Sequence, residues 1–262
     1  MSLSNLEMEE LKQARFLLEN PGLAAKITNM LGSPIERGFA MLPKSWSDKV
    51  TDVTRKSIET ALDVALWSLA SSKGPATSSN GWHKAAVGVT GAAGGAFGLA
   101  ALTIELPIST TIILRSIADI ARSEGEDLSF PGGKLQCVQV LALGGASKTD
   151  DAAETGYFAA RAALAQAVSA AATHVAHKGL SATGGPALAR VIAEVSARFS
   201  INVTEKVAAQ AVPVVGAVGG ALINTLFISH FQDMGRGHFV IRRLERKYGA
   251  DEVQGLYEQL GR

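Results

Sequence analysis

Two groups of ionisable side chains, each following a long apolar segment, are the residues of this sequence best suited to chemistry. Carboxylates and histidines together can bind a divalent metal and activate a water molecule for hydrolysis. The candidates for a catalytic role are Glu105, Asp119 and His230, and a metal site would add Asp233 and His238. Apart from such a divalent metal, no cofactor is predicted.

Two other interpretations of the same residues stay open. A charged side chain among apolar neighbours is costly to bury unless it is paired. Glu105, Arg115 and Asp119 would then form buried ion pairs that fix the register of helices, with His230 as a core histidine. Alternatively, these polar groups line a cavity for a lipid or another small ligand.

One octapeptide pattern precedes both groups. Residues 89–96 read VTGAAGGA and residues 214–221 read VVGAVGGA, so the pattern recurs at an offset of 125 residues. Glu105 and His230 each follow their own copy by nine residues and therefore occupy equivalent places. If the two copies pack side by side and parallel, these side chains lie at one depth; if antiparallel, they lie at opposite ends.

The apolar segments that contain the octapeptides are residues 85–104 and 207–229, and neither carries a charge. Both reach the length of a membrane span, but Gly and Ala dominate them in place of Leu, Ile and Phe. Glycines at intervals of three or four residues favour close contact between helices. We therefore expect two closely packed Gly/Ala-rich central helices, with Pro107 interrupting the first just after Glu105.

Familiar catalytic motifs are missing from the sequence. It contains no HExxH and no GxSxG, and Cys137 lies in an apolar run. On a continuous helix the histidines at 230 and 238 are rotated by about 80° from each other. A metal shared by both would need a break in the helix, which Gly235 and Gly237 could supply.

Charge and composition narrow the classes of partner and compartment. A net charge of +1 does not indicate binding to a nucleic acid. The single cysteine fits a reducing compartment, and the amphipathic N-terminus without an apolar core predicts no signal peptide. We expect a cytoplasmic protein, peripheral at the inner face of a membrane, whose partner is the membrane surface or a membrane protein. One basic run is either a solvated helix face or a contact for anionic headgroups: Arg242, Arg243, Arg246 and Lys247.

Helical periodicity without strand alternation predicts an all-α fold of nine to eleven helices in one multi-helix domain. Ser4 and Glu7 have the spacing of a capping box. Residues 134–145 are expected to form a short buried helix or strand, and residues 200–202 to split one helical stretch in two. The expected organisation is N-terminal amphipathic helices at 1–43, the main helical domain at 44–249 and a C-terminal helix at 250–262.

Several stretches resemble the EcsC family of bacterial proteins. They include IELPISTTIILRSIADIARSEGEDL (104–128), LALGG (141–145), TGYFAAR (155–161), RFSINVTEK (198–206), VPVVGAVGGALIN (212–224) and HFQDMGRGHFVIRRLERKYG (230–249). The family is named after a gene beside an ABC-transporter operon. The resemblance therefore implies a bacterial protein that is membrane-associated or linked to a transporter, and it supplies no catalytic residues.

These observations favour a non-enzymatic accessory protein that binds at or inserts into a membrane, in connection with an ABC transporter. Two charge-free segments of spanning length, too rich in glycine to be typical spans, are the basis of this hypothesis. One alternative is a metal-dependent, peptidase-like hydrolase with its site near Glu105 and His230. The other is a helical protein that binds a lipid or a small ligand. The sequence indicates no particular oligomeric state.

Overall fold

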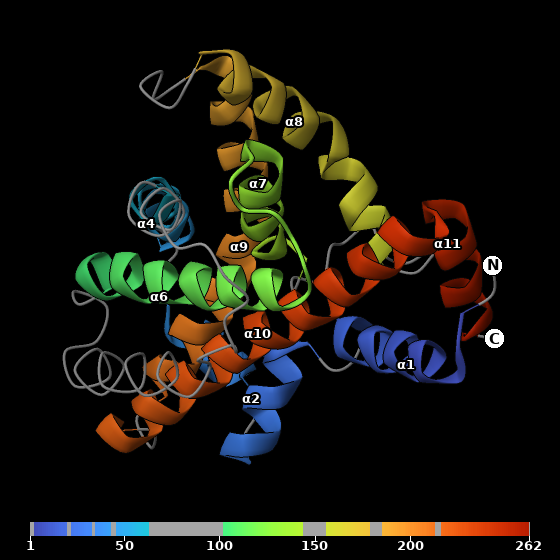
Figure 1. Ribbon diagram of the computed structural model, residues 1–262. Coiled ribbons are helices and arrows are strands. Elements are labelled where there is room, and N and C mark those ends of the chain that lie inside the picture. Colours follow the sequence, from blue (N-terminus) through green and yellow to red (C-terminus); the bar gives the residue numbers. More distant parts are fainter. Residues whose placement is uncertain are drawn as a thin grey trace.

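The computed structural model describes residues 3–19, 22–32, 35–42, 46–62, 102–143, 156–178, 185–212 and 216–261. These residues form ten α-helices and no strand in a single helical domain, which confirms the predicted all-α fold (Figure 1). The helices are α1 (Asn5–Glu19), α2 (Leu23–Leu31), α3 (Glu36–Met41), α4 (Trp46–Ala61), α6 (Leu102–Ser123), α7 (Pro131–Val140), α8 (Gly156–Lys178), α9 (Pro186–Ala211), α10 (Gly216–Tyr248) and α11 (Ala250–Gln259). The first octapeptide, 89–96, lies outside the described residues, so the predicted contact between the two copies stays a prediction.

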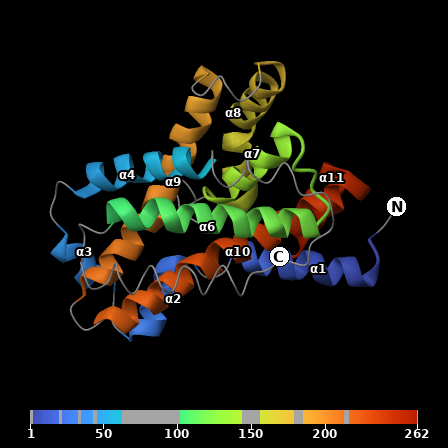
Figure 2. The ribbon, with the colours of Figure 1, turned by 60° about the vertical axis from the view of Figure 1, so that its left-hand side comes forward.

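Helices α6 and α10 are the central pair, and they run in the same direction (Figures 1 and 2). Two side-chain contacts give their register. The Asn224 amide donates to Glu105 over 3.2 Å, and the Gln232 amide donates to Ser116 over 2.7 Å. Because the residue numbers increase together along both helices, the pair is parallel.

The other helices cover this pair on several sides. Helix α4 packs against α6 and α9, while α1 packs along α10. Helix α8 packs against α9 and α7, and α8 and the first part of α9 extend away from the central helices (Figure 2). A reciprocal capping box opens α1: Ser4 N–H donates to Glu7 Oε2 (2.9 Å), and Glu7 N–H donates to Ser4 Oγ (3.3 Å).

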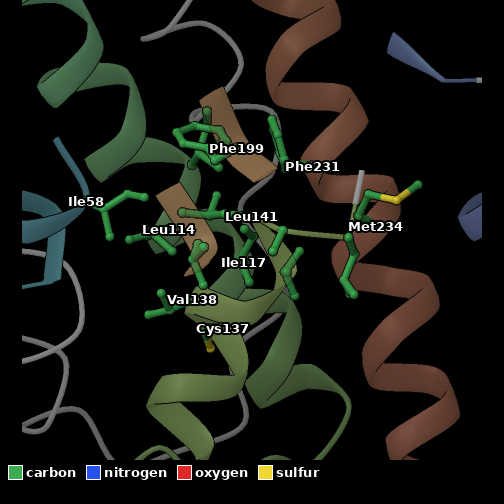
Figure 3. Packing of buried hydrophobic residues seen from close by; sticks show 14 of the residues in the cluster. Ile58, Leu114, Ile117, Cys137, Val138, Leu141, Phe199, Phe231 and Met234 are labelled. Carbon is green, nitrogen blue, oxygen red and sulfur yellow. The ribbon is translucent and has the colours of Figure 1, made fainter. Parts of the chain in front are cut away.

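The apolar core lies where α4, α6, α7, α9 and α10 meet (Figure 3). Leu114 and Ile117 of α6 lie beside Val138 of α7 and Phe199 of α9, all fully buried. The buried positions of α6 recur at three- and four-residue intervals, which places them on one face of the helix. Of the stretch 134–145, for which a helix or a strand was expected, residues 134–140 belong to α7 and residues 141–143 to the turn after it.

Two expected interruptions are wrong, and a third break that the sequence allowed does not occur in α10. Helix α6 continues through Pro107, which is only its sixth residue, so the proline removes one hydrogen bond near the helix start. Helix α9 continues through residues 200–202, and within it the Ser200 hydroxyl donates to the carbonyl of Ala197 (2.9 Å). Helix α10 continues through Gly235 and Gly237.

Of these two glycines of α10, Gly237 allows close packing between helices. A Cβ at Gly237 would lie 2.6 Å from Leu18 Cγ and 2.9 Å from the Ala14 carbonyl oxygen, so α1 could not approach α10 as it does. The second apolar segment, 207–229, is divided between the end of α9 and the first half of α10. None of the described helices combines the length and the apolar character needed to cross a bilayer.

Candidate ligand-binding site

Glu105 lies in a buried ion pair with Lys206 of α9. The lysine Nζ is 2.7 and 2.9 Å from the two carboxylate oxygens, and the exposed fractions of the two side chains are 0% for Lys206 and 6% for Glu105. The Asn224 amide adds a third donor, and the Phe227 ring lies 4.9 Å from Nζ. The polar partners of this carboxylate among the described residues are donors, and they fix its position.

The other carboxylate candidates pair with residues other than Glu105. Asp119 pairs with Arg122 one turn later on α6 (3.5 Å), and Arg115 is exposed. Asp233 pairs with Lys26 of α2 (3.1 Å) and with Arg236. His230 is buried, with its ring against Phe231. Among the described residues, no three His, Cys, Asp or Glu side chains gather closely enough to hold a metal ion.

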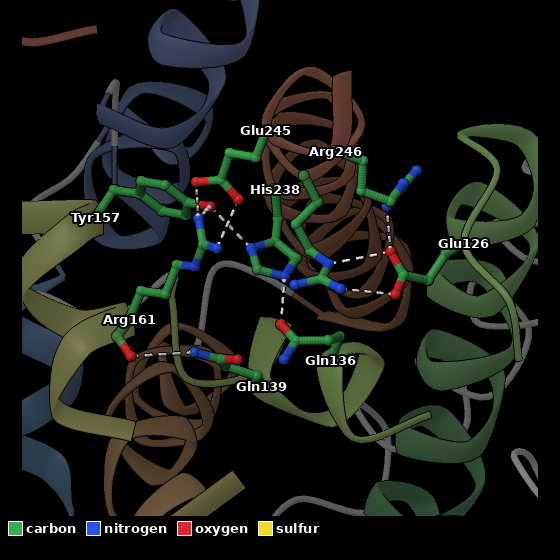
Figure 4. Close-up of polar contacts among 9 residues, drawn as sticks. Glu126, Gln136, Gln139, Tyr157, Arg161, His238, Glu245 and Arg246 are labelled. Atoms are coloured by element: carbon green, nitrogen blue, oxygen red, sulfur yellow. Dashed lines mark hydrogen bonds and ion pairs between the residues drawn. The ribbon is translucent and has the colours of Figure 1, made fainter. Parts of the chain in front are cut away.

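His238 belongs to a different cluster, built from α7, α8 and α10 (Figure 4). Its Nδ1 lies 2.9 Å from the Tyr157 hydroxyl, and its Nε2 lies 3.2 Å from the Gln136 Oε1. Arg161 donates to the same hydroxyl over 3.4 Å, so the tyrosine proton points to Nδ1. His238 is therefore the neutral tautomer that donates from Nε2 to Gln136.

The charge state of this cluster follows from its surroundings. Complete burial, together with the guanidinium charges of Arg161 and Arg242, holds the pKa of His238 well below its usual range. Burial also raises the pKa of the Tyr157 hydroxyl, against the opposite effect of Arg161. The imidazole and the phenol thus both stay neutral near pH 7, and the pair acts as a fixed chain of hydrogen bonds.

Two bidentate ion pairs hold the arginines of the cluster. Arg161 donates to both carboxylate oxygens of Glu245 over 2.7 and 2.6 Å. Arg242 donates to both oxygens of Glu126 over 3.0 and 2.7 Å, and Arg246 adds a bond of 2.6 Å to the same carboxylate (Figure 4). Bidentate geometry of this kind fixes the plane of a guanidinium as well as its charge.

The basic run of α10 is paired along its whole length. Besides Arg242 and Arg246, Arg243 contacts Glu10 of α1 (2.8 Å) and Glu124 (3.2 Å). Lys247 contacts Glu7 of α1 at 2.7 Å. These residues therefore join α10 to α1 and to the segment between α6 and α7.

A pocket of about 380 Å³ opens beside the arginines. Its polar side is formed by Gln136, Gln139, Arg161 and Arg242, and the first turn of α7 contributes Gly132 and Gly133. The face of α8 that carries Arg161 continues as a strip of small residues that also line the pocket, namely Ala165, Val168, Ser169 and Ala172. The described structure thus places a donor-rich wall and a mostly apolar wall around one cavity, the arrangement typical of small-molecule sites.

Of the sequence-derived candidates, the pocket and its hydrogen-bond network include Arg242, Arg246 and His238. Tyr157, Arg161, Gln136 and Glu126 were not singled out as site residues, because each comes from another helix or loop and no local spacing links it to α10. Tyr157 and Arg161 do occur together in TGYFAAR, four residues apart and hence on one helical face. That spacing was the available signal.

Comparison with known proteins assigns the chain to a family. The model of the EcsC protein family matches residues 5–244, and the chain belongs to this family. The match includes α1, α2 and α3 as well as the central helices. Searches of curated proteins and of solved structures found no match.

Proposed function

We propose that this EcsC-family protein is a non-enzymatic binding protein that holds a small ligand in the pocket between α7, α8 and α10. The observation that carries the proposal is the pairing of a donor-rich wall with an apolar wall around one cavity. A volume of about 380 Å³ lies near the lower end of the range of about 300–1,000 Å³ typical of ligand pockets. The pocket therefore suits one small metabolite or a single headgroup.

Preorganisation of the polar wall supports binding. Glu245 and Glu126 hold the two guanidinium groups from behind, and His238 holds the side chain of Gln136. A ligand entering the pocket then meets donors that are already ordered, which lowers the entropic cost of association. Both ring nitrogens of His238 have protein partners, which favours a positioning role over proton transfer to a substrate.

Native mass spectrometry and a thermal-shift screen of small metabolites test the proposal. Gly132→Leu places a side chain where a Cβ meets no atom within 4 Å, so it fills the mouth of the pocket without a clash. Gly255→Leu on α11 is the matched control, because Gly255 also has open space around its Cβ and does not line the pocket. We expect ligand binding to be lost in the first variant and kept in the second. Equal binding by both variants would refute the proposal.

A second proposal is that the protein works as a membrane-peripheral accessory factor. Ile104 and Ile108, one turn apart on α6, are 71% and 44% exposed, and Leu222 near the start of α10 is 50% exposed. Because α6 and α10 are parallel, their starts lie at the same end of the molecule (Figure 2). Apolar side chains exposed at one end can enter the interfacial layer of a bilayer.

Sedimentation with liposomes tests this second proposal. The double variant Ile104→Ser, Ile108→Ser should lose sedimentation, while Leu6→Ser, which changes an equally exposed side chain on α1, should keep it. A wild-type protein that stays in the supernatant would refute the membrane hypothesis. An ABC transporter that co-purifies with the wild type, but not with the double variant, would identify the membrane partner.

A further inference from the structure

We infer that the ligand of the α7–α8–α10 pocket is a phosphate monoester, whose phosphate binds Arg161, Arg242 and Gln136 and whose organic part lies on α8. The inference rests on the proposed binding function and adds the chemical class of the ligand. Four features of the described pocket support it: the number of free donors, the local charge, the start of α7 and the apolar wall.

The N–H donors that remain available at the pocket outnumber the hydrogen bonds that a carboxylate can accept. A guanidinium has five N–H groups. Arg161 uses three of them on Glu245 and Tyr157, and Arg242 uses two on Glu126. The two arginines therefore keep two and three N–H donors, and the Gln136 amide contributes two more. A carboxylate offers about four lone-pair positions, whereas the three terminal oxygens of a phosphate monoester can accept more bonds.

The local charge favours an anion. The guanidinium groups of Arg161 and Arg242, which line the pocket, are each paired with one carboxylate, of Glu245 and Glu126, and each keeps N–H groups from which a second anion can accept. The depressed pKa of the buried His238 has the same electrostatic origin in part, because both Arg161 and Arg242 act on it. An anionic ligand could therefore accept hydrogen bonds from both guanidinium groups at once.

The start of α7 adds backbone donors to the same pocket. Phe130, the N-cap residue, supplies no side-chain hydrogen bond to the first turn, and Gly132 and Gly133 of that turn line the pocket. Free N–H groups at a helix start carry about half a positive charge and bind phosphate well. The absence of any atom within 4 Å of a Cβ at Gly132 leaves room for an oxyanion there.

The strip of small residues on α8 favours a ligand with an organic portion. Ala165, Val168 and Ala172 present only small apolar side chains to the cavity. Inorganic phosphate would leave this surface in contact with water, while the carbon skeleton of an ester would cover it. A soluble phosphate ester and the headgroup of phosphatidic acid both present this chemistry.

The hydrogen bonds that link Tyr157, His238 and Gln136 fix the orientation of the Gln136 side-chain amide. Since His238 donates to the Gln136 Oε1, the Gln136 NH₂ group is left as the donor toward the pocket. Gln136→Glu is then a sharp probe, because the glutamate can still accept from His238 while an anionic oxygen replaces the NH₂. Its matched control is Gln166→Glu, the same change at an exposed position of α8 outside the pocket.

Isothermal titration calorimetry with glycerol 3-phosphate, and with glycerol as the neutral analogue, tests the inference. We expect the wild type and Gln166→Glu to bind glycerol 3-phosphate with affinities within about twofold, and glycerol not to bind. Gln136→Glu should weaken binding by at least about 10- to 100-fold, since a charge-assisted hydrogen bond is replaced by repulsion. Equal affinities of the two glutamate variants would overturn the inference. Gly132→Leu should abolish binding with every donor still in place.

Vesicles of phosphatidylcholine with and without phosphatidic acid distinguish the two sources of phosphate. Sedimentation that needs both phosphatidic acid and Gln136 supports a lipid headgroup, and binding of glycerol 3-phosphate alone supports a soluble ester. Binding of neither phosphate compound overturns the inference. If a neutral compound then binds and Gly132→Leu blocks it, the proposed binding function still stands; if Gly132→Leu blocks no compound, both proposals fail.

Discussion

Neutralising Lys206 while Glu105 keeps its charge should lower the free energy of unfolding by about 3–5 kcal/mol, the usual cost of stranding a buried charge. The lysine side chain is fully buried, and its Nζ contacts both carboxylate oxygens at 2.7 and 2.9 Å. Lys206→Met keeps the length of the side chain and removes only the ammonium group. Glu105→Gln removes the opposite charge, keeps an oxygen that can accept from Asn224, and should cost a similar amount.

The double variant should be milder than either single variant, because it leaves no unpaired charge in the core. Urea unfolding followed by circular dichroism gives the four free energies of a double-mutant cycle, for which we expect a coupling energy of several kcal/mol. The exposed pair Arg190–Glu194, with a 2.9 Å contact on α9, is the control. Removing the charge of Arg190 should cost less than about 1 kcal/mol.

Two results would contradict this reasoning. Single variants within about 1 kcal/mol of the wild type would mean that neither charge depends on the other. A double variant that costs the sum of both singles would mean that the two side chains act independently. The metal-site alternative predicts a different pattern: Glu105→Gln would then lower the metal content of protein purified without a metal column, and divalent metal would stabilise only the wild type.

Three further predictions concern other parts of the fold. Burial raises the pKa of Glu205 to about 7, against the bond that its carboxylate accepts from the Ala24 N–H. Since the folded protein holds this proton more tightly than the unfolded chain, stability should fall by at most about 3 kcal/mol as pH rises from about 4.5 to 7, and urea unfolding of Glu205→Gln should lack this component. Gly237→Ala should lower the melting temperature by forcing α1 away from α10, at a cost of about 1–3 kcal/mol, whereas Gly235→Ala, whose Cβ has contacts of 3.7 Å or more, should be neutral or stabilising. Ser4→Ala removes the capping box of α1 and should cost about 1 kcal/mol in the same melting experiment.

Local signals predicted the elements well, because the physics of a helix is mostly local. The capping box at Ser4 and Glu7 forms as expected, and apolar periodicity identified the helical segments. The errors arose where a residue type has two uses. Pro107 was expected to interrupt a helix, and Gly235 and Gly237 were possible sources of a break. Yet α6 continues through its proline, and Gly237 permits close packing of α1 on α10.

Partners separated by a hundred residues could not be predicted in this way. A buried ion pair for Glu105 was one of three interpretations, but its partner lies 101 residues away, on α9. Likewise, the contacts of His238 come from α7 and α8, 102 and 81 residues earlier. The packing of the helices decides which polar side chains come into contact. Local spacing in the sequence does not reveal that packing.

The octapeptide repeat shows this limit most clearly, because its sequence register differs from the register in space. In sequence, Glu105 corresponds to His230 at an offset of 125 residues. In space, Glu105 meets Asn224 and Ser116 meets Gln232, at offsets of 119 and 116 residues. The shift of six to nine residues amounts to about 9–14 Å along a helix, so His230 lies well beyond the level of Glu105. Parallel packing of α6 and α10 therefore brings the end of α6 and its following loop to Arg242, twelve residues past His230, where Glu126 holds the arginine at the pocket. The central pair α6 and α10 thus positions the pocket. The side chains that form its polar side lie near Arg242, beyond the positions of Glu105 and His230 to which the repeat pointed.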